Sequence, residues 1–137
     1  MKKIRLSVLV LICVFIAPVL AGAGDFDGSK PLLCAVIQTF ECGADWECTR
    51  GVAKDIDIPQ FLKINFKKKT ISSTPEAGPV RVTKIKNMER LEGRLFLQGV
   101  QNGRAWSMTI NEASGQATLS ASDDQVGFIV FGACTTQ

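Results

Sequence analysis

Apolar side chains recur at helical spacing in the segment that follows residue 30. These positions are Leu32, Leu33, Val36, Ile37 and Phe40. Ser29 is a suitable helix cap, and Pro31 suits a first helical turn because a backbone N–H would have no partner there. The spacing and the cap together predict a helix over residues 31–41.

After residue 60 the pattern changes to an alternation of apolar and polar residues, which is typical of strands. Leu95 and Leu97, for example, fall on one face, and Phe96 and Gln98 fall on the other. The sequence 101–103, Gln-Asn-Gly, is the strongest hairpin signal in the chain. The predicted strands cover residues 61–66, 70–72, 80–86, 91–100, 104–110, 116–122 and 126–133.

The last predicted strand, residues 126–133, is apolar on both faces, so each face needs cover. The sheet core covers one face, and the predicted helix is the natural cover for the other. The expected fold is therefore mainly β (α+β), with the N-terminal helix packed by a disulfide on an antiparallel meander of about six to eight strands. Both an open curved sheet and a small closed barrel satisfy this pattern.

Residues 1–23 have the three parts of a secretory signal peptide. Basic Lys2, Lys3 and Arg5 precede an apolar run over residues 8–20, and small residues follow at 21–23. The run is shorter than the roughly 20 residues that span a bilayer, which disfavours an uncleaved anchor. We therefore expect cleavage before Gly24, a periplasmic or secreted protein without a membrane span, and a single disulfide-bonded domain over residues 24–137.

Removal of the signal peptide changes the charge of the chain. The sequence has 16 Lys and Arg and 13 Asp and Glu, and residues 1–23 hold three of the basic residues and none of the acidic ones. The remaining 114 residues (137 minus 23) have 13 charges of each sign and therefore no net charge. Nucleic acid is not an expected partner of such a domain, because it attracts basic surfaces.

Four cysteines remain after cleavage: Cys34, Cys42, Cys48 and Cys134. An even number in a small exported domain indicates two disulfides. On the predicted helix, Cys34 and Cys42 would lie roughly 12 Å apart, which exceeds the reach of a disulfide. We therefore expect Cys42 to pair with Cys48 and Cys34 with Cys134. A metal site is disfavoured because the chain has no Cys-x-x-Cys pair and no histidine; a redox-active pair is a further alternative.

The sequence contains neither histidine nor tyrosine, which limits the catalytic mechanisms open to it. Ser-His-Asp and Cys-His arrangements are excluded, and the usual general base near neutral pH is missing. Ser107 lies in a predicted strand, where a polar sheet face is the simpler interpretation. Paired carboxylates fall in predicted loops and turns, at Asp55 and Asp57, Glu89 and Glu92, and Asp123 and Asp124. We therefore expect no enzyme activity, catalytic residue, cofactor or metal site.

Three features are candidate contacts for a ligand or partner. Lys67, Lys68 and Lys69 form a basic turn that Lys84 and Lys86 extend if their strand lies alongside, although a solvated hairpin is the simpler interpretation. Trp46, in the loop between Cys42 and Cys48, is either an exposed binding anchor or a core residue beside the disulfide. Trp106 on a predicted strand is the third candidate.

The chain resembles a group of small exported bacterial proteins of unassigned function. The resemblance rests on Cys34, Cys42, Cys48, Leu95, Leu97, Gln98, Gly99, Trp106-Ser107 and the closing Phe131-Gly132-Ala133-Cys134. It covers most of the chain after the signal peptide and implies no particular chemistry.

The chain is also similar to periplasmic lysozyme inhibitors in size, cysteine use and expected β architecture. The inhibitory motif of the group that acts on C-type lysozymes begins Ser-Gly and ends in Tyr. Residues 114–118, Ser-Gly-Gln-Ala-Thr, have the opening but lack the final aromatic residue. This departure puts the inhibitory function in doubt.

Two functions from different classes remain. The first is an exported, non-enzymatic binding protein of the bacterial envelope that holds a small apolar molecule or lipid inside a partly open barrel. The second is a protein-interaction module or inhibitor that binds an envelope protein through residues 49–60 or the Trp46 loop. A cavity lined by Phe and Leu would favour the first, and a filled core with an exposed aromatic patch the second. We expect the first.

Overall fold

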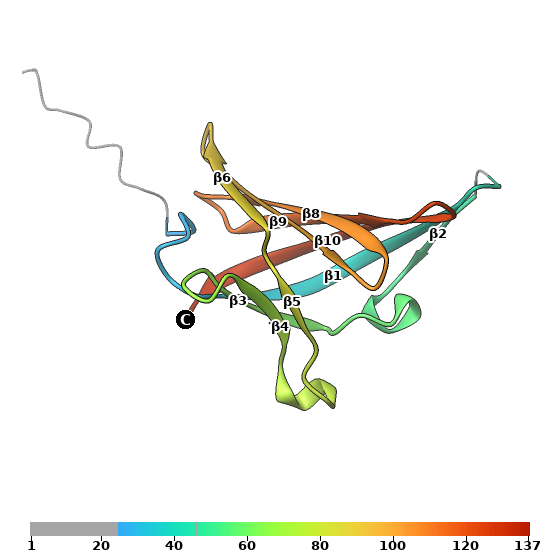
Figure 1. Ribbon diagram of the computed structural model, residues 1–137, viewed down its shortest axis with the longest axis horizontal. Helices are drawn as coiled ribbons and strands as arrows, with labels where there is room; N and C mark the ends of the chain where they lie inside the picture. Colours follow the sequence, from blue (N-terminus) through green and yellow to red (C-terminus); the bar gives the residue numbers. More distant parts are fainter. Residues whose placement is uncertain (1–24, 46) are drawn as a thin grey trace, which may run out of the picture.

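The protein is an antiparallel half-barrel built from one curled sheet of ten strands (Figure 1). The computed structural model describes residues 25–45 and 47–137. The predicted signal peptide, residues 1–23, and the candidate contact Trp46 lie outside the described residues. Within the described ranges, no helix is long and apolar enough to cross a bilayer.

The strands follow one another along the chain with short connections. They are β1 (Leu32–Gly43), β2 (Cys48–Gly51), β3 (Phe61–Asn65), β4 (Thr70–Ser73), β5 (Val82–Lys84), β6 (Asn87–Leu91), β7 (Arg94–Gln101), β8 (Arg104–Asn111), β9 (Gln116–Ser122) and β10 (Val126–Thr136). Two 3-10 turns, η1 (Ala53–Ile56) and η2 (Pro75–Ala77), complete the structure.

The strand order explains why the sheet curls. It runs β5-β4-β3-β1-β10-β9-β8-β7-β6, with β2 paired to the outer part of β1. Its two end strands, β5 and β6, are consecutive in the chain and are joined by Ile85 and Lys86 alone (Figure 1). The Ile85 N–H donates to the Lys69 carbonyl at 2.8 Å, and the Lys86 N–H donates to the Gln98 carbonyl at 2.7 Å. The bent segment therefore holds one end of the sheet close to the other.

The helix expected over residues 31–41 is wrong, because this segment forms β1. Leu32, Cys34 and Val36 are buried in alternation, and a bulge between Val36 and Gln38 then shifts the register so that Thr39 faces inward. The intervening residues are also apolar, which made the strand look helical: a strand that is apolar on both faces has no clear period of two. No helix covers the outer face of β10 within the described part of the chain.

Most strands after residue 60 agree with the predicted ones, but their number is ten rather than six to eight. The segment 80–86, expected as one strand, gives the short β5 and then the bend into β6. β2 and β6 were not expected at all. Both strands are short and exposed on both faces, and β6 lies at the edge of the sheet, where it pairs with β7. Their sequences therefore lack the alternation of apolar and polar residues by which a strand is recognised.

The disulfides join Cys34 to Cys134 and Cys42 to Cys48, which is the predicted pairing. The geometry behind it differs from the prediction. Cys34 and Cys134 are directly opposite on β1 and β10, with Cα atoms 3.9 Å apart. Cys34 and Cys42 lie eight residues apart along one strand, about 26 Å at 3.3 Å per residue, so they are even further apart than on a helix. Two disulfides are compatible with an oxidising compartment outside the cytoplasm.

The hydrophobic core fills one end of the half-barrel, where β1 begins and β10 ends. Its fully buried aliphatic side chains are Leu32, Ile64, Leu95, Leu97 and Ile110. Glu112 at the same end is buried and accepts two hydrogen bonds from the Arg90 guanidinium, at 2.6 and 2.9 Å. These bonds lower the pKa of Glu112, so the carboxylate stays charged although it is buried.

Candidate functional site

The interior of the half-barrel is not filled at its other end, where a cavity of about 280 Å³ opens. One wall comes from β3, β4 and the segment before β5, and the facing wall comes from β8, β9 and β10. The apolar residues of the lining include Leu62, Ile71, Trp106, Leu119, Ala121 and Phe128. The cavity is therefore an apolar pocket that continues from the filled core.

Strand register places the apolar residues of the second wall in rows. Trp106 on β8 pairs with Ala121 on β9, and Ala121 pairs with Phe128 on β10. Because side chains alternate across a sheet, these three residues share the concave face. The small Ala121 between two aromatic residues leaves space, and this space is part of the cavity.

Trp106 spans the gap between the two walls. It is buried, and its indole N–H donates to the Thr83 hydroxyl on β5 at 3.2 Å. Gly99 on β7 lies against the indole ring: a Cβ at this position would overlap with the ring and approach the Lys84 carbonyl oxygen to 2.6 Å. Trp106 therefore forms the inner end of the cavity, in a position that the glycine makes available.

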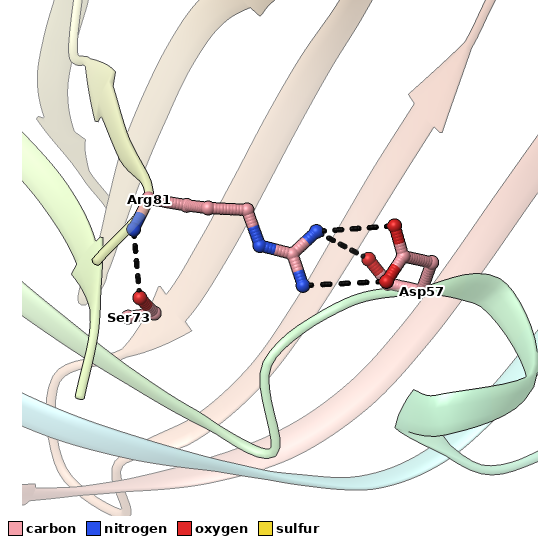
Figure 2. A network of polar contacts seen from close by, with 3 residues as sticks. All are labelled: Asp57, Ser73 and Arg81. Atoms are coloured by element: carbon pink, nitrogen blue, oxygen red, sulfur yellow. Dashed lines mark hydrogen bonds and ion pairs between the residues drawn. The ribbon is translucent and has the colours of Figure 1, made fainter. Parts of the chain in front are cut away.

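An ion pair lies at the rim of the cavity, between the turn that follows η1 and the segment that enters β5. Figure 2 shows the Arg81 guanidinium reaching across to Asp57, with hydrogen bonds of 2.8 Å to the Asp57 carbonyl and 3.3 and 3.4 Å to its carboxylate. The Arg81 backbone N–H donates to the Ser73 hydroxyl at 2.9 Å. Both Arg81 and Asp57 line the cavity.

A second arginine, Arg104, lines the cavity from the facing wall. Its Nε donates to Asp123 at 2.9 Å, and its guanidinium carbon lies 5.0 Å from the centre of the Phe128 ring. Asp123 also accepts the backbone N–H groups of Gln125 and Val126, each at 2.9 Å. These backbone donors and the Arg104 guanidinium lower the pKa of Asp123 to about 2. Arg104 is therefore held beside the cavity by a carboxylate that is ionised at neutral pH.

The arrangement can enclose the apolar body of a small molecule and present charged groups to its polar end. Mostly apolar pockets with a few placed polar groups are the usual form of small-molecule sites. Among the described residues, no three Cys, Asp or Glu side chains are grouped so that they would hold a metal ion.

Of the candidate contact residues that the structure describes, Trp106 alone lines this cavity. Lys67, Lys68 and Lys69 are exposed in the turn between β3 and β4, at the filled end of the half-barrel. Lys84 pairs with Thr70, and the Ile85 N–H bonds to Lys69, so the strand bearing Lys84 and Lys86 does lie alongside this turn. Lys69 and Lys86 line a second, more open hollow, separate from the apolar cavity.

The remaining candidates are dispersed. Ser107 lies on β8 between Gln98 and Ser120 of the neighbouring strands, in the row next to Trp106 and on the opposite face. Asp57 lies at the rim of the cavity and Asp123 behind Arg104, while Asp55 accepts the backbone N–H of Val52 at 2.8 Å. Asp55 and Asp57, which are close in the sequence, therefore have different surroundings in the structure.

Sequence reasoning missed Arg81 and Arg104. Arg104 follows the Asn102-Gly103 turn and is two residues before Trp106, so strand alternation places both on one face. That signal was present in the sequence. Arg81 had no comparable signal, because its position depends on how far the sheet curls.

The outer face of the sheet carries an exposed apolar stripe over β3, β1 and β10. Ile37, Phe61 and Phe131 are 65%, 44% and 43% exposed. Phe131 also packs edge-to-face against Phe40, with ring centres 6.2 Å apart. Exposed apolar residues that lie together can mark a surface that contacts another molecule.

Comparisons of this chain with protein-family models, with curated proteins and with solved structures find no match.

Proposed function

We propose that this chain is an exported, non-enzymatic binding protein of the bacterial envelope that holds a small, mainly apolar molecule in the half-barrel. The observation that carries the proposal is the contrast between the two ends of the interior. One end is filled by buried aliphatic side chains, while the other has a cavity of about 280 Å³ with an apolar lining.

Three further features support this proposal. The Cys34–Cys134 disulfide holds β10, which contributes Phe128 to the cavity, in register with the central strand β1, so this wall is restrained before a ligand binds. Its lining surface is mainly apolar, with leucine, isoleucine and aromatic side chains beside several polar residues, as in ligand pockets. The two disulfides and the signal-peptide pattern of residues 1–23 both suit a protein that works outside the cytoplasm.

The proposal is tested by filling the cavity. Ala121 lies between Trp106 and Phe128 on the concave face, so Ala121→Phe should occupy the space that a ligand needs. Ala105→Phe adds the same group one residue from Trp106 on the exposed face and is the matched control. We expect binding of 1-octanol, measured by titration calorimetry, to be lost in the first variant and kept in the second.

Native mass spectrometry of protein purified from its own export compartment provides an independent test. A co-purifying small molecule supports the binding function, and its loss in Ala121→Phe places that molecule in the cavity. Protein that is empty in this experiment and also does not bind 1-octanol would contradict the proposal.

A protein-interaction module is the second candidate, and the exposed apolar stripe of Ile37, Phe61 and Phe131 favours it. In its lysozyme-inhibitor form, the protein would block a C-type lysozyme at near-equal molar ratio, and Phe131→Ser would weaken the block. Unchanged lysis of cell walls in the presence of excess wild-type protein rejects this form of the candidate.

A further inference from the structure

The two walls of the cavity each contribute one arginine. Arg81 precedes β5 on the first wall, Arg104 begins β8 on the facing wall, and both line the cavity together with one carboxylate, Asp57. Each arginine is paired with a carboxylate, Arg81 with Asp57 and Arg104 with Asp123, so these four side chains have no net charge. What the opening offers is two guanidinium groups with N–H donors, and an apolar pocket with such donors at its opening is complementary to a molecule that has an apolar body and an acidic head.

Arg104 has the geometry of a prepared anion receptor. Its hydrogen bond to Asp123 uses Nε, and its two terminal nitrogens make no hydrogen bond to any described residue. The contact with the Phe128 ring and the bond to Asp123 restrict the side chain before any ligand arrives. A guanidinium that is already oriented loses less conformational entropy when it binds a carboxylate or an acidic ester.

Arg81 has a partner that an incoming anion can replace. The Asp57 side chain is 93% exposed and the Arg81 side chain 47%, so their ion pair is in contact with solvent. Exposed pairs of this kind contribute little to stability. A ligand head group at the rim therefore competes with Asp57 for Arg81 at low cost.

The size of the cavity limits the body of the ligand. At roughly 30 Å³ for each water-sized group, a volume of about 280 Å³ has room for on the order of ten non-hydrogen atoms. An unbranched chain the length of octanoate is of this size.

We propose that the ligand is a small amphipathic anion, whose acidic head group binds Arg81 and Arg104 while its apolar chain lies between the walls against Trp106. This inference rests on the proposed function and adds the chemical class of the ligand. Carboxylates and acidic esters share the chemistry that two guanidinium groups recognise.

Three probes with the same chain test the head group: octanoate, octyl sulfate and neutral 1-octanol, each below its critical micelle concentration. Titration calorimetry of the oxidised, full-length mature protein at low salt should show both anions binding about tenfold more tightly than 1-octanol, as one charge-assisted hydrogen bond would give. Tighter binding of octanoate would identify the natural head group as a carboxylate, and tighter binding of octyl sulfate would identify it as an acidic ester. Added salt should reduce the difference.

Variants assign the effect to the two arginines. We expect Arg104→Gln and Arg81→Gln each to weaken octanoate binding more than 1-octanol binding, so that the tenfold difference between the two probes becomes smaller. Arg104→Lys should restore part of the loss because it keeps the charge. Arg94→Gln is the control. Arg94 is exposed at the start of β7, whereas the cavity is lined by Gln101 at the end of that strand. Circular dichroism establishes that each variant is folded.

The outcomes separate the inference from the function on which it rests. Equal affinity for 1-octanol and the anions, or octanoate binding that both Arg→Gln variants leave unchanged, would overturn the anionic head group and leave the apolar binding function intact. Failure of all three probes to bind the wild-type protein would overturn the proposed function and the inference together.

Discussion

The Trp106 indole N–H donates to the Thr83 hydroxyl at 3.2 Å and thereby links β8 to β5. Along the strand order these two strands are separated by β4, β3, β1, β10 and β9. The bond therefore crosses the open side of the half-barrel rather than following the sheet. It fixes the aromatic end of the cavity and holds the walls at their observed separation.

Removal of this bond should be measurable as a loss of stability. Thr83→Val keeps the shape of the side chain but leaves the indole N–H without its acceptor, so we expect the free energy of unfolding to fall by about 1 kcal/mol. Urea unfolding measures this change. Thr109→Val is the control, because Thr109 lies on the other face of β8 and its hydroxyl makes no hydrogen bond to the described residues. An equal loss in both variants would show that the bond to Trp106 is not the cause.

Gly99→Ala should displace Trp106. The added Cβ would overlap with the indole and lie 2.6 Å from the Lys84 carbonyl oxygen, so the ring and the β5 backbone must move. Overpacking of this kind costs roughly 1 to 3 kcal/mol. We expect a lower unfolding midpoint and a shift in tryptophan emission. In the control variant Gly127→Ala on β10, the new Cβ would meet no atom within 4 Å, and stability should be nearly unchanged. Similar effects of the two substitutions would contradict the packing argument.

The two disulfides should differ in their contributions to stability. Cys34 and Cys134 are 100 residues apart, whereas Cys42 and Cys48 are 6 apart. In the chain-entropy account, removal of the disulfide that closes the long loop lowers the free energy of unfolding by about 4 to 5 kcal/mol, and removal of the one that closes the short loop lowers it by about 2 kcal/mol. Denaturant unfolding of the double variants Cys34→Ala/Cys134→Ala and Cys42→Ala/Cys48→Ala makes the comparison. A larger loss from the second pair would contradict the prediction.

Asp123 should make stability depend on pH in the acidic range. Its pKa in the folded protein is about 2, below the ordinary value of 3.8, so its bonds contribute fully above about pH 4. That contribution is lost as the pH falls from about 4 towards 2, because the unfolded chain takes up the proton first. Asp123→Asn should flatten this part of a plot of unfolding midpoint against pH. Asp124→Asn, at the exposed neighbouring position, should leave the slope as in the wild type. Identical slopes for all three proteins would contradict the assignment to Asp123.

Several strands after residue 60 could be predicted because one of their faces is buried and the other is exposed to solvent. On β7, Leu95 and Leu97 are buried while Gln98 is exposed, and this contrast is visible in the sequence. β1 has no such contrast: Leu33 and Ala35 on its outer face are as apolar as its inner residues. Its bulge between Val36 and Gln38 interrupts the period further. A segment of this kind fits a helix and a buried strand equally well until its partners are known.

The cysteine pairing was predicted correctly although the helix on which it rested is a strand. Cys34 and Cys42 are too far apart to pair on a helix and on a strand alike. The cavity was less accessible to prediction. Its walls come from segments as distant as Leu62 and Phe128, and only the curl of the sheet brings them together. Strand alternation could have linked Arg104 to Trp106, whereas the contact of Arg81 with Asp57 depends on two connections that no periodic pattern describes.

The central strand pair of the sheet joins the start of the domain to its end. β1 pairs with β10 along nearly its whole length, and the Gln137 N–H donates to the Pro31 carbonyl at 3.0 Å. Until β10 is available, β1 can pair only with the shorter strands β2 and β3 among the described strands. A truncation that removes β10 therefore takes away the middle of the sheet rather than an edge, so the remaining strands would form two separate parts with exposed strand edges.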